Sequence, residues 1–534
     1  MSTSIGDTGP LLILAIAGPV TYFLARNMFG HDSREPPLAP ASIPLVSHVI
    51  GLSRSSFDYH VELSKQINAP IFTMPLPGQK MYVVTQPELI QLAQKQHRTL
   101  AFPPIEAKFA TTVVGLSPEA QAILARNVNG DDGDHGLSME TYAAMRAALH
   151  PGPALDDMNR AMLVEIGKAL DLLLQPAATG EKTTCRRLGL HAWLQDKLTV
   201  ATTRAVYGPQ NPFDDKQVAD AFWEFEGGLM SILVGFLPSI TARKPVAART
   251  KVAQAFERYY KVGGVEQASA YAKNRYQVEV NNKFPLRDTA LSSVGGTIAL
   301  LVNTVPALFW VLLHLYQYPG LLQEIRDEVD ACIDANSTGT ALKIIDMVLL
   351  KEKCPLLLSA YQEVLRYRTI GASVREVMED THLGPYLLKK GAMLQMPSRV
   401  IHTDTTLWGD TDFRPRRFLA EEKEKKSRPR DVCFRAFGGG KTLCPGRHFA
   451  TNEILAVVAL FVARFDMKPV DGGEWKFPTT ANTNVAAAVM GPDYDVEVEI
   501  ATREGCQGDR WAVRLEASDK TFAIVTEDVV GEEN

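Results

Sequence analysis

The chain has 534 residues, of which 46% are hydrophobic and 22% are charged, and this composition is typical of a protein that buries a large core. It excludes a disordered chain. The formal net charge of -5 and the scattered Lys and Arg residues argue against nucleic acid as a partner. The six cysteines are widely spaced and form no CxxC pair, so neither a disulfide framework nor a zinc site is expected.

The N-terminus predicts a membrane anchor. The segment from Gly9 to Ala25 is uncharged and mainly apolar, and Arg26 and Arg34 follow it. Its length is at the short end of the ~17 to 25 residues that cross a bilayer. A cleaved signal peptide is the competing interpretation, but no Lys or Arg precedes the apolar run. The positive-inside rule then places the rest of a single-pass protein in the cytosol.

A proline-rich segment follows the anchor. Residues 35–40 (EPPLAP) and Pro44 cannot continue a helix and favour extended backbone. We therefore expect an anchor at 1–30, a stiff spacer at 31–48 and one catalytic domain at 49–534.

Helices are expected to dominate the catalytic domain. Residues 71–85 contain two short β-runs around Pro77-Gly78, which predicts a hairpin. Apolar residues recur at helical spacing from Met158 to Leu174, and the segments 218–225 and 252–260 are amphipathic too. The predicted fold is mainly α with small β-sheets.

The longest predicted helix runs from Asp288, its expected N-cap, to about Tyr318. At 1.5 Å per residue it would be ~45 Å long. It is apolar nearly all round, which is typical of a central, buried helix. Pro306 lies inside it and is expected to disturb it locally, because proline has no N–H for the carbonyl four residues back.

The strongest chemical signal is a glycine-rich loop that carries a cysteine. Residues 437–446 read FGGGKTLCPG and precede an apolar helical run at 449–465. A cysteine at a helix start is favoured as a thiolate, because backbone N–H groups and the helix dipole stabilise negative charge. Gly440 would let the loop fold back, Gly446 would let a flat cofactor approach the backbone, and Phe437 would shield the sulfur. The alternative is a glycine loop around a buried, inert cysteine.

The pattern FxxGxxxCxG, formed by Phe437, Gly440, Cys444 and Gly446, resembles the heme-binding signature of the cytochrome P-450 family. The resemblance implies a cytochrome P-450 fold that binds heme b, with Cys444 as the axial ligand of the iron. It also implies a monooxygenase that inserts oxygen from O2 into a hydrophobic small molecule. Electrons would come from NADPH-cytochrome P-450 reductase in the endoplasmic reticulum membrane.

Other motifs strengthen this resemblance. Glu363 and Arg366 match the family's ExxR motif, on a helix predicted to begin near Pro355. Residues 413–418 (FRPRRF) resemble the FxPxRF segment, whose arginine, here Arg417, joins Glu363 and Arg366 in a buried structural triad.

The stretch that leads into the FRPRRF segment also resembles the family. His402, Asp404 and Trp408 match that stretch, and we expect them to have a packing role.

The predicted heme contacts depart in part from the family pattern. Thr442, beside Lys441, stands where many members have Arg or His for a heme propionate. Arg375 matches the family's usual propionate arginine. Tyr142 and Arg146 are predicted to take the place of the WxxxR motif, with Arg146 binding the heme.

The long helix carries the predicted catalytic residues. The family's usual acid-alcohol pair is replaced here by Asn303-Thr304, so the acid of the usual proton relay is missing. Thr304 is expected to orient a water, and Asn303 to hold that water or the substrate. The missing acid leaves open a heme-thiolate isomerase or dehydratase that needs no reductase. A heme-carrying binding protein without turnover is a third, less favoured interpretation.

The substrate is inferred by analogy. Residues 303–310 (NTVPALFW) are similar to the branch that contains sterol 7α-hydroxylases and prostacyclin synthase, and the C-terminal extension at 503–534 is similar to fungal members. This favours a sterol, a terpenoid or another fungal secondary metabolite. Leu229 to Leu237 is apolar enough to be a channel lip that dips into the membrane, or a buried helix end.

Overall fold

The structure is a computed structural model that describes residues 30–43, 45–55, 57–174, 185–234, 238–335, 341–424, 431–484, 486–516, 524–525 and 528. The described residues fall into two compact units. The first comes from Met1–Phe102 and Ala372–Ile401, and the second comes from Pro103–Gly371 and His402–Asn534. Apart from Gly30, the predicted anchor lies outside the described residues, as do residues 235–237 of the predicted channel lip. The boundaries at residues 30 and 48 stay predictions.

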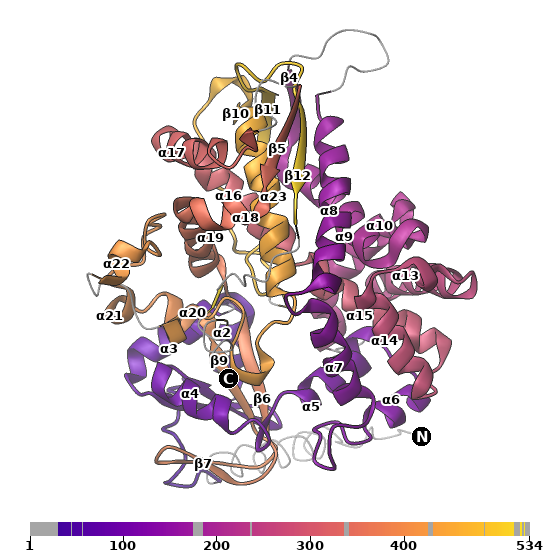
Figure 1. The fold of residues 1–534 in the computed structure, drawn as a ribbon. Coiled ribbons are helices and arrows are strands. Elements are labelled where there is room, and N and C mark those ends of the chain that lie inside the picture. Colours follow the sequence, from indigo (N-terminus) through magenta and orange to yellow (C-terminus); the bar gives the residue numbers. More distant parts are fainter. Residues whose placement is uncertain are drawn as a thin grey trace, which may run out of the picture. The chain divides into compact units, whose positions relative to one another are not determined.

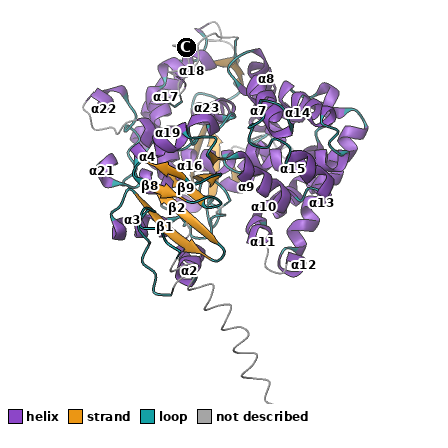
Figure 2. Cartoon of the chain, turned by 90° about the horizontal axis from the view of Figure 1, so that it is seen from below, coloured by secondary structure: helices purple, strands orange, loops and turns teal. Residues whose placement is uncertain are grey.

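The first unit is built on a five-stranded sheet in the order β1-β2-β9-β6-β3, of which Figure 2 labels β1, β2 and β9. Its strands are β1 (Ile71–Leu76), β2 (Gln79–Val84), β3 (Leu100–Ala101), β6 (Ala372–Val377) and β9 (Met393–Pro397). Strands β1 and β2 pair antiparallel, and Gly78 between them has a φ of +73°, which glycine adopts without steric cost. The hairpin predicted at residues 71–85 is confirmed.

Short helices and a second hairpin complete this unit. They are α2 (Val46–Ser55), α3 (Asp58–Ile67), α4 (Pro87–Lys95), the pair β7 (Thr381–Leu383) and β8 (Tyr386–Leu388), and α20 (Ser398–His402), whose last residue is assigned to the second unit. Leu63 of α3 is buried in one apolar cluster with Phe72, Met74 and Val83 of the β1-β2 hairpin. One face of the hairpin is thus covered by helix, which explains its apolar side chains.

The second unit is mainly helical, with two small sheets (Figure 1). Its first helices are α5 (Pro103–Phe109), η1 (Ala110–Val114), α6 (Pro118–Leu124), α7 (Leu137–Leu149), α8 (Pro153–Asp171), α9 (Leu190–Tyr207), η2 (Gly208–Gln210), η3 (Pro212–Asp214), α10 (Lys216–Gly227), α11 (Leu229–Val234), α12 (Pro238–Thr241), α13 (Arg243–Lys261), η4 (Gly264–Gln267) and α14 (Ala270–Asn281).

The later helices include the ones that carry the predicted motifs. They are α15 (Leu286–Leu301), α16 (Thr304–Gln317), α17 (Pro319–Asp330), α18 (Met347–Lys353), α19 (Pro355–Arg368), α21 (Thr405–Trp408), α22 (Ala420–Glu424), η6 (Asp431–Cys433), η7 (Gly440–Thr442), α23 (Arg447–Arg464) and η8 (Val470–Gly472). The expectation of a mainly helical protein with small sheets is confirmed.

Both sheets of the second unit use strands from distant parts of the chain. One has the order β10 (Phe465–Pro469), β11 (Glu497–Thr502) and β4 (Cys185–Gly189), and the other pairs β12 (Arg510–Arg514) with β5 (Leu342–Asp346) in parallel. Strand β12 belongs to the predicted C-terminal extension. That part of the extension is therefore an integral strand of the unit.

The predicted long helix is present but interrupted. Helix α15 ends at Leu301 and α16 begins at Thr304. The prediction of one continuous helix from 288 to 318 is therefore wrong. The break precedes Pro306 by one turn, because proline cannot donate a hydrogen bond to the carbonyl of residue 302. Helical hydrogen bonding resumes where Ala307 N donates to Asn303 O at 3.2 Å.

The expected N-cap of this helix is also wrong. Asp288 is the third residue of α15, and Pro285 occupies the N-cap position. The Asp288 carboxylate accepts hydrogen bonds from Ser117 N at 2.7 Å and from Ser117 Oγ at 2.8 Å instead. A partner 171 positions away in the sequence therefore determines the orientation of this side chain.

Helices α16 and α23 form the centre of the second unit. All residues of α16 from Thr304 to Tyr316 are buried, and α23 is buried from Thr451 to Arg464. Tyr316 Oη donates to Phe461 O at 3.1 Å and to Phe465 O at 2.9 Å, which joins the two helix ends. Helix α23 begins two residues earlier than expected and ends at Arg464, since Phe465 opens β10.

Among the described residues, one helical stretch is long and apolar enough to cross a membrane. It spans Leu286–Gln317, and 78% of its most apolar window is buried inside the protein. This burial identifies the stretch as the core helix pair α15-α16.

Candidate active site

The cysteine loop closes on itself just before α23. Cys444 N donates to Phe437 O at 3.0 Å, and Leu443 N donates to Gly440 O at 3.0 Å. Gly438 and Gly440 have φ values of +79° and +62°, a region in which a side chain would be strained. The loop therefore folds back at Gly440, and its expected position under the ligand stays a prediction. Phe437 is half-buried, and its predicted shielding of the sulfur stays a prediction.

The Cys444 sulfur lies at the N-terminus of α23. Burial raises the pKa of Cys444 above its ordinary value, whereas the backbone N–H groups of Gly446 and Arg447 and the charge of Arg447 lower it. The free thiol is therefore neutral near pH 7, and a metal cation would deprotonate it on coordination. A Cβ added at Gly446 would meet no atom within 4 Å. The sulfur donor and this open backbone fit a flat, iron-containing cofactor.

A buried ionic cluster lies on α19. Glu363 accepts from Arg366 Nε and Nη2, both at 2.8 Å, and from Arg417 Nε at 3.1 Å. All three side chains are almost fully buried. Asp410 provides the second negative charge, because its Oδ1 accepts from Arg417 Nη2 at 2.8 Å. Burial raises the pKa of Asp410, but the bond and charge of Arg417 outweigh this and lower it.

The structure thus brings Glu363 and Arg366, on a helix that begins at Pro355 as expected, together with Arg417 of the FRPRRF segment. Asp410 was missed by sequence reasoning. Its only sequence signal is a position between Trp408 and the FRPRRF segment, and nothing in that spacing identifies an arginine partner.

His402 links this cluster to the cysteine loop. Its carbonyl accepts from Arg366 Nη1 at 2.7 Å, and its ring Nε2 accepts from the backbone N–H of Arg435 at 2.8 Å. Arg435 lies two residues before Phe437, and His402 is completely buried. Trp408 O accepts from Arg417 Nη1, while Asp404 caps α21 through Thr406 N. These contacts are hydrogen bonds, and the packing role expected for His402, Asp404 and Trp408 stays a prediction.

Asn303 and Thr304 lie at the interruption between α15 and α16. Thr304 Oγ1 donates to Leu300 O at 3.2 Å, so the hydroxyl caps a carbonyl at the broken turn. Asn303 Oδ1 accepts from Ala488 N at 2.7 Å and from Val489 N at 3.2 Å. Asn303 therefore connects residues 488 and 489 to the helix break, and its amide nitrogen has no hydrogen bond among the described residues.

The two arginines that are predicted to bind the heme, Arg146 and Arg375, belong to different units. Arg146 of α7 is exposed and donates to Lys441 O at 3.4 Å, which brings it to the cysteine loop. Tyr142 Oη instead donates to Glu106. Arg375 belongs to β6 of the first unit, where it is buried, donates to Val374 O at 2.7 Å and lies over the Phe102 ring. Its role toward the heme stays a prediction.

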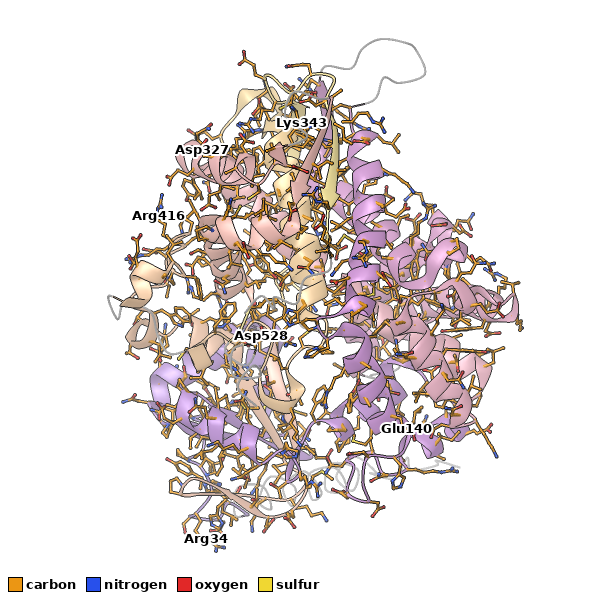
Figure 3. All side chains as sticks on the ribbon, viewed as in Figure 1. Arg34, Glu140, Asp327, Lys343, Arg416 and Asp528 are labelled. Carbon is orange, nitrogen blue, oxygen red and sulfur yellow. The ribbon has the colours of Figure 1, made fainter. Side chains whose placement is uncertain are left out.

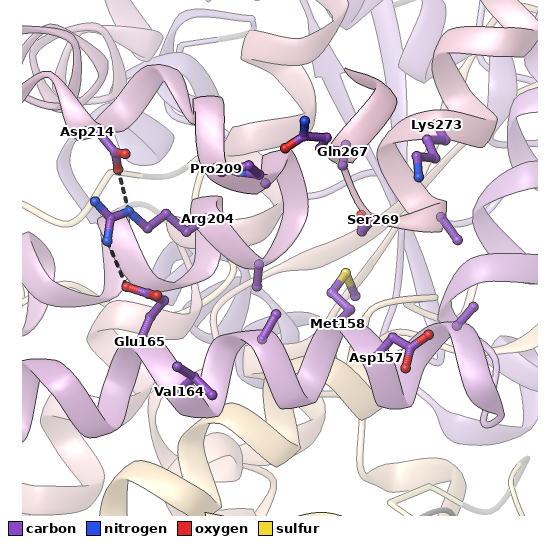
Figure 4. Close-up of a pocket in the computed structure, with 16 residues that line it drawn as sticks. Asp157, Met158, Val164, Glu165, Arg204, Pro209, Asp214, Gln267, Ser269 and Lys273 are labelled. Carbon is purple, nitrogen blue, oxygen red and sulfur yellow. Dashed lines mark hydrogen bonds and ion pairs between the residues drawn. The ribbon is translucent and has the colours of Figure 1, made fainter. Parts of the chain in front are cut away.

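A surface pocket of about 840 Å³ lies between α8, α9 and the start of α14. Figure 4 shows its charged residues: Arg204 is bonded to Glu165 and to Asp214 at 2.8 and 2.7 Å. The lining includes none of the predicted site residues. Arg204, Glu165 and Asp214 are thus already paired with one another.

The cysteine loop, the buried ionic cluster and the interrupted helix are features expected of a heme-thiolate enzyme. The cytochrome P450 family model matches residues 270–494. The chain is 33% identical over 525 residues to the cytochrome P450 monooxygenase nodJ of Hypoxylon pulicicidum, covering 96% of this chain and 99% of the relative. A cytochrome P450 monooxygenase of Gibberella zeae is 29% identical, with 94% and 95% covered. Cytochrome P450 7B1 of Mus musculus is 24% identical, with 87% and 91% covered.

The chain therefore belongs to the cytochrome P450 family. It is a monooxygenase that binds heme b through a cysteine thiolate, acts on a hydrophobic substrate and receives electrons from a redox partner.

Proposed function

We propose that Cys444 is the cysteine that binds the heme iron. The observation that carries this proposal is the position of the sulfur at the first turn of α23, where two backbone N–H groups and Arg447 counteract the effect of burial on its pKa. Such donors reduce the charge density on a thiolate without neutralising it. The heme, when bound, supplies the activation of O2.

We propose that the substrate is a sterol, a terpenoid or another fungal secondary metabolite. The similarity to two fungal monooxygenases and to cytochrome P450 7B1 over most of the chain supports this range. Another relative, from Rattus norvegicus, is named 25-hydroxycholesterol 7-alpha-hydroxylase and is 26% identical over 344 residues.

The chain's own residues have three proposed roles in this reaction. Thr304 orients a water through its hydroxyl, and the Asn303 amide nitrogen holds this water or the substrate. Arg146, which already reaches the carbonyl of Lys441, and Arg375 bind the heme propionates. Glu363, Arg366 and Arg417 have a structural role, because they hold α19 against the segment that leads into the cysteine loop.

We further propose that NADPH-cytochrome P-450 reductase is the electron donor and that the protein is a single-pass protein of the endoplasmic reticulum membrane. Its catalytic domain would face the cytosol. The apolar segment from Gly9 to Ala25, followed by Arg26, supports this arrangement.

A redox-neutral isomerisation or dehydration at the same heme is the alternative to the family's monooxygenase reaction. The observation that favours it is Asn303, which stands in place of the usual acid and whose oxygen is bonded to the backbone of the 488–489 loop. NADPH consumption in step with product formation supports the monooxygenase, whereas product formation without reductase supports the isomerase.

The reduced carbon monoxide difference spectrum tests the central proposal. The purified protein should show the strongly red-shifted Soret band of thiolate ligation, and Cys444→Ser should lose it. Cys506→Ser is a matched control, because Cys506 is also half-buried but its thiol is bonded to Ala463 O. A thiolate spectrum that survives in Cys444→Ser contradicts the proposal.

A further inference from the structure

A carboxylate from the C-terminal extension lies against the first turn of α23. Asp528 Oδ1 accepts from Arg447 Nε at 2.9 Å and from Arg447 Nη2, and it lies 3.3 Å from His448 Nε2. Arg447 and His448 are the first two residues of the helix that follows Cys444. Figure 3 labels Asp528 among the side chains of the structure. Its side chain is only 2% exposed.

The Asp528 carboxylate is held in this position from its other side. Its Oδ2 accepts from Ile524 N at 2.9 Å and from Val525 N at 3.0 Å. Ile524 and Val525 are buried, and Ile524 O accepts from Gln362 Nε2 of α19 at 3.4 Å. Ile524 is therefore bonded to the helix of Glu363, and Asp528, which binds the backbone of Ile524 and Val525, is bonded to the helix that follows Cys444.

Arg447 connects this carboxylate to the cysteine. Its Nη1 donates to Cys444 O at 3.1 Å, while its other guanidinium nitrogens bind Asp528. Burial raises the pKa of Asp528, but the hydrogen bonds from His448 and Arg447 outweigh burial and hold the pKa well below its usual range. Asp528 is thus ionised at any physiological pH. It fixes the orientation of Arg447 and compensates a positive charge near the sulfur.

We propose that Asp528 is a positioning residue for the heme-thiolate loop, which it holds through Arg447 and the carbonyl of Cys444. The inference rests on the proposed role of Cys444 as the iron ligand. It assigns to the C-terminal extension a function in keeping the thiolate bound and in setting the charge beside it.

Two measurable effects follow for Asp528→Asn. Arg447 loses its anionic partner, so the Cys444 loop is held less firmly and the thiolate-type spectrum is lost faster on incubation. The positive charge of Arg447 is also no longer compensated, which favours the reduced, more negative iron. The one-electron reduction equilibrium should shift toward the reduced form by up to about tenfold, which equals ~59 mV.

The experiment compares Asp528→Asn, Asp528→Glu and Asp509→Asn in the full-length, heme-loaded protein. Asp509 is the matched control, because it lies in the same extension and its side chain has no hydrogen bond or ion pair among the described residues. The readouts are the thiolate fraction of the reduced carbon monoxide spectrum over time and the heme reduction potential. Asp528→Glu should recover much of both, and Asp509→Asn should match the original protein.

Arg447→Leu completes a double-mutant cycle. Asp528→Asn should add little in an Arg447→Leu background, because the proposed action passes through Arg447. If Asp528→Asn yields no folded protein, Arg447→Leu decides alone: an unchanged spectrum and potential in that variant would overturn the inference. Unchanged behaviour of Asp528→Asn in both readouts would overturn it too. Absence of a thiolate spectrum in the original protein would instead reject the role of Cys444.

Discussion

The buried cluster on α19 makes a strong prediction for Glu363→Ala. The Glu363 carboxylate is fully buried and accepts hydrogen bonds from Arg366, Arg417 and the backbone N–H of Arg414. Its removal leaves Arg366 without a carboxylate partner, while Arg417 keeps Asp410. The charge of the buried Arg366 side chain is then uncompensated.

The magnitude follows from this loss of charge balance. Removing one partner of a buried ion pair destabilises a protein by ~3 to 5 kcal/mol, because the remaining charge is left uncompensated. Total stabilities are only about 5–15 kcal/mol. We therefore expect a marked fall in the yield of folded, heme-containing protein, and Glu363→Gln, which keeps hydrogen-bond acceptors but loses the charge, should be intermediate.

Heme content per protein and thermal unfolding are the assays. Glu324→Ala is the matched control, because Glu324 also pairs with an arginine, Arg416, but both side chains are about half exposed. Such exposed pairs contribute ~0 to 1 kcal/mol. The reasoning is refuted if Glu363→Ala has the heme content and melting temperature of Glu324→Ala.

Three further predictions concern other parts of the chain. Thr304→Ala should lower coupled product formation by ~10²-fold while hydrogen peroxide release rises, and Thr304→Ser should restore coupling; unchanged coupling would mean that another group holds the water. Deletion of residues 1–30 should release the protein from membranes with its heme retained, whereas persistent binding would indicate a second contact such as Leu229 to Leu237. Burial raises the pKa of Glu453 to about 8 against an opposing bond from Thr202, so folding stability should fall as pH rises from ~4.5 to about 8. Glu453→Gln should flatten this decline in melting temperature, and a parallel decline would refute the assignment.

The sequence by itself determined the features that depend on local interactions. The hairpin at 71–85 follows from two apolar β-runs around a glycine turn, and the helix from Pro355 follows from helical spacing after a proline. The cysteine loop also belongs here, because its glycines can adopt the left-handed conformations of the loop without steric cost. Even the disturbance at Pro306 was expected, since the missing N–H is a property of one residue.

Only the tertiary structure decided which polar groups meet. The sequence predicts that Asn303 holds a water or the substrate, yet its side-chain oxygen is bonded to the backbone at residues 488 and 489. The sequence predicts that Asp288 is a helix N-cap, yet its carboxylate accepts a hydrogen bond from Ser117. Asp528 carries no motif at all, and it meets Arg447 from 81 positions away. A buried polar side chain must find a partner, and packing across the chain selects that partner from many of the same chemical type, so spacing alone cannot name it.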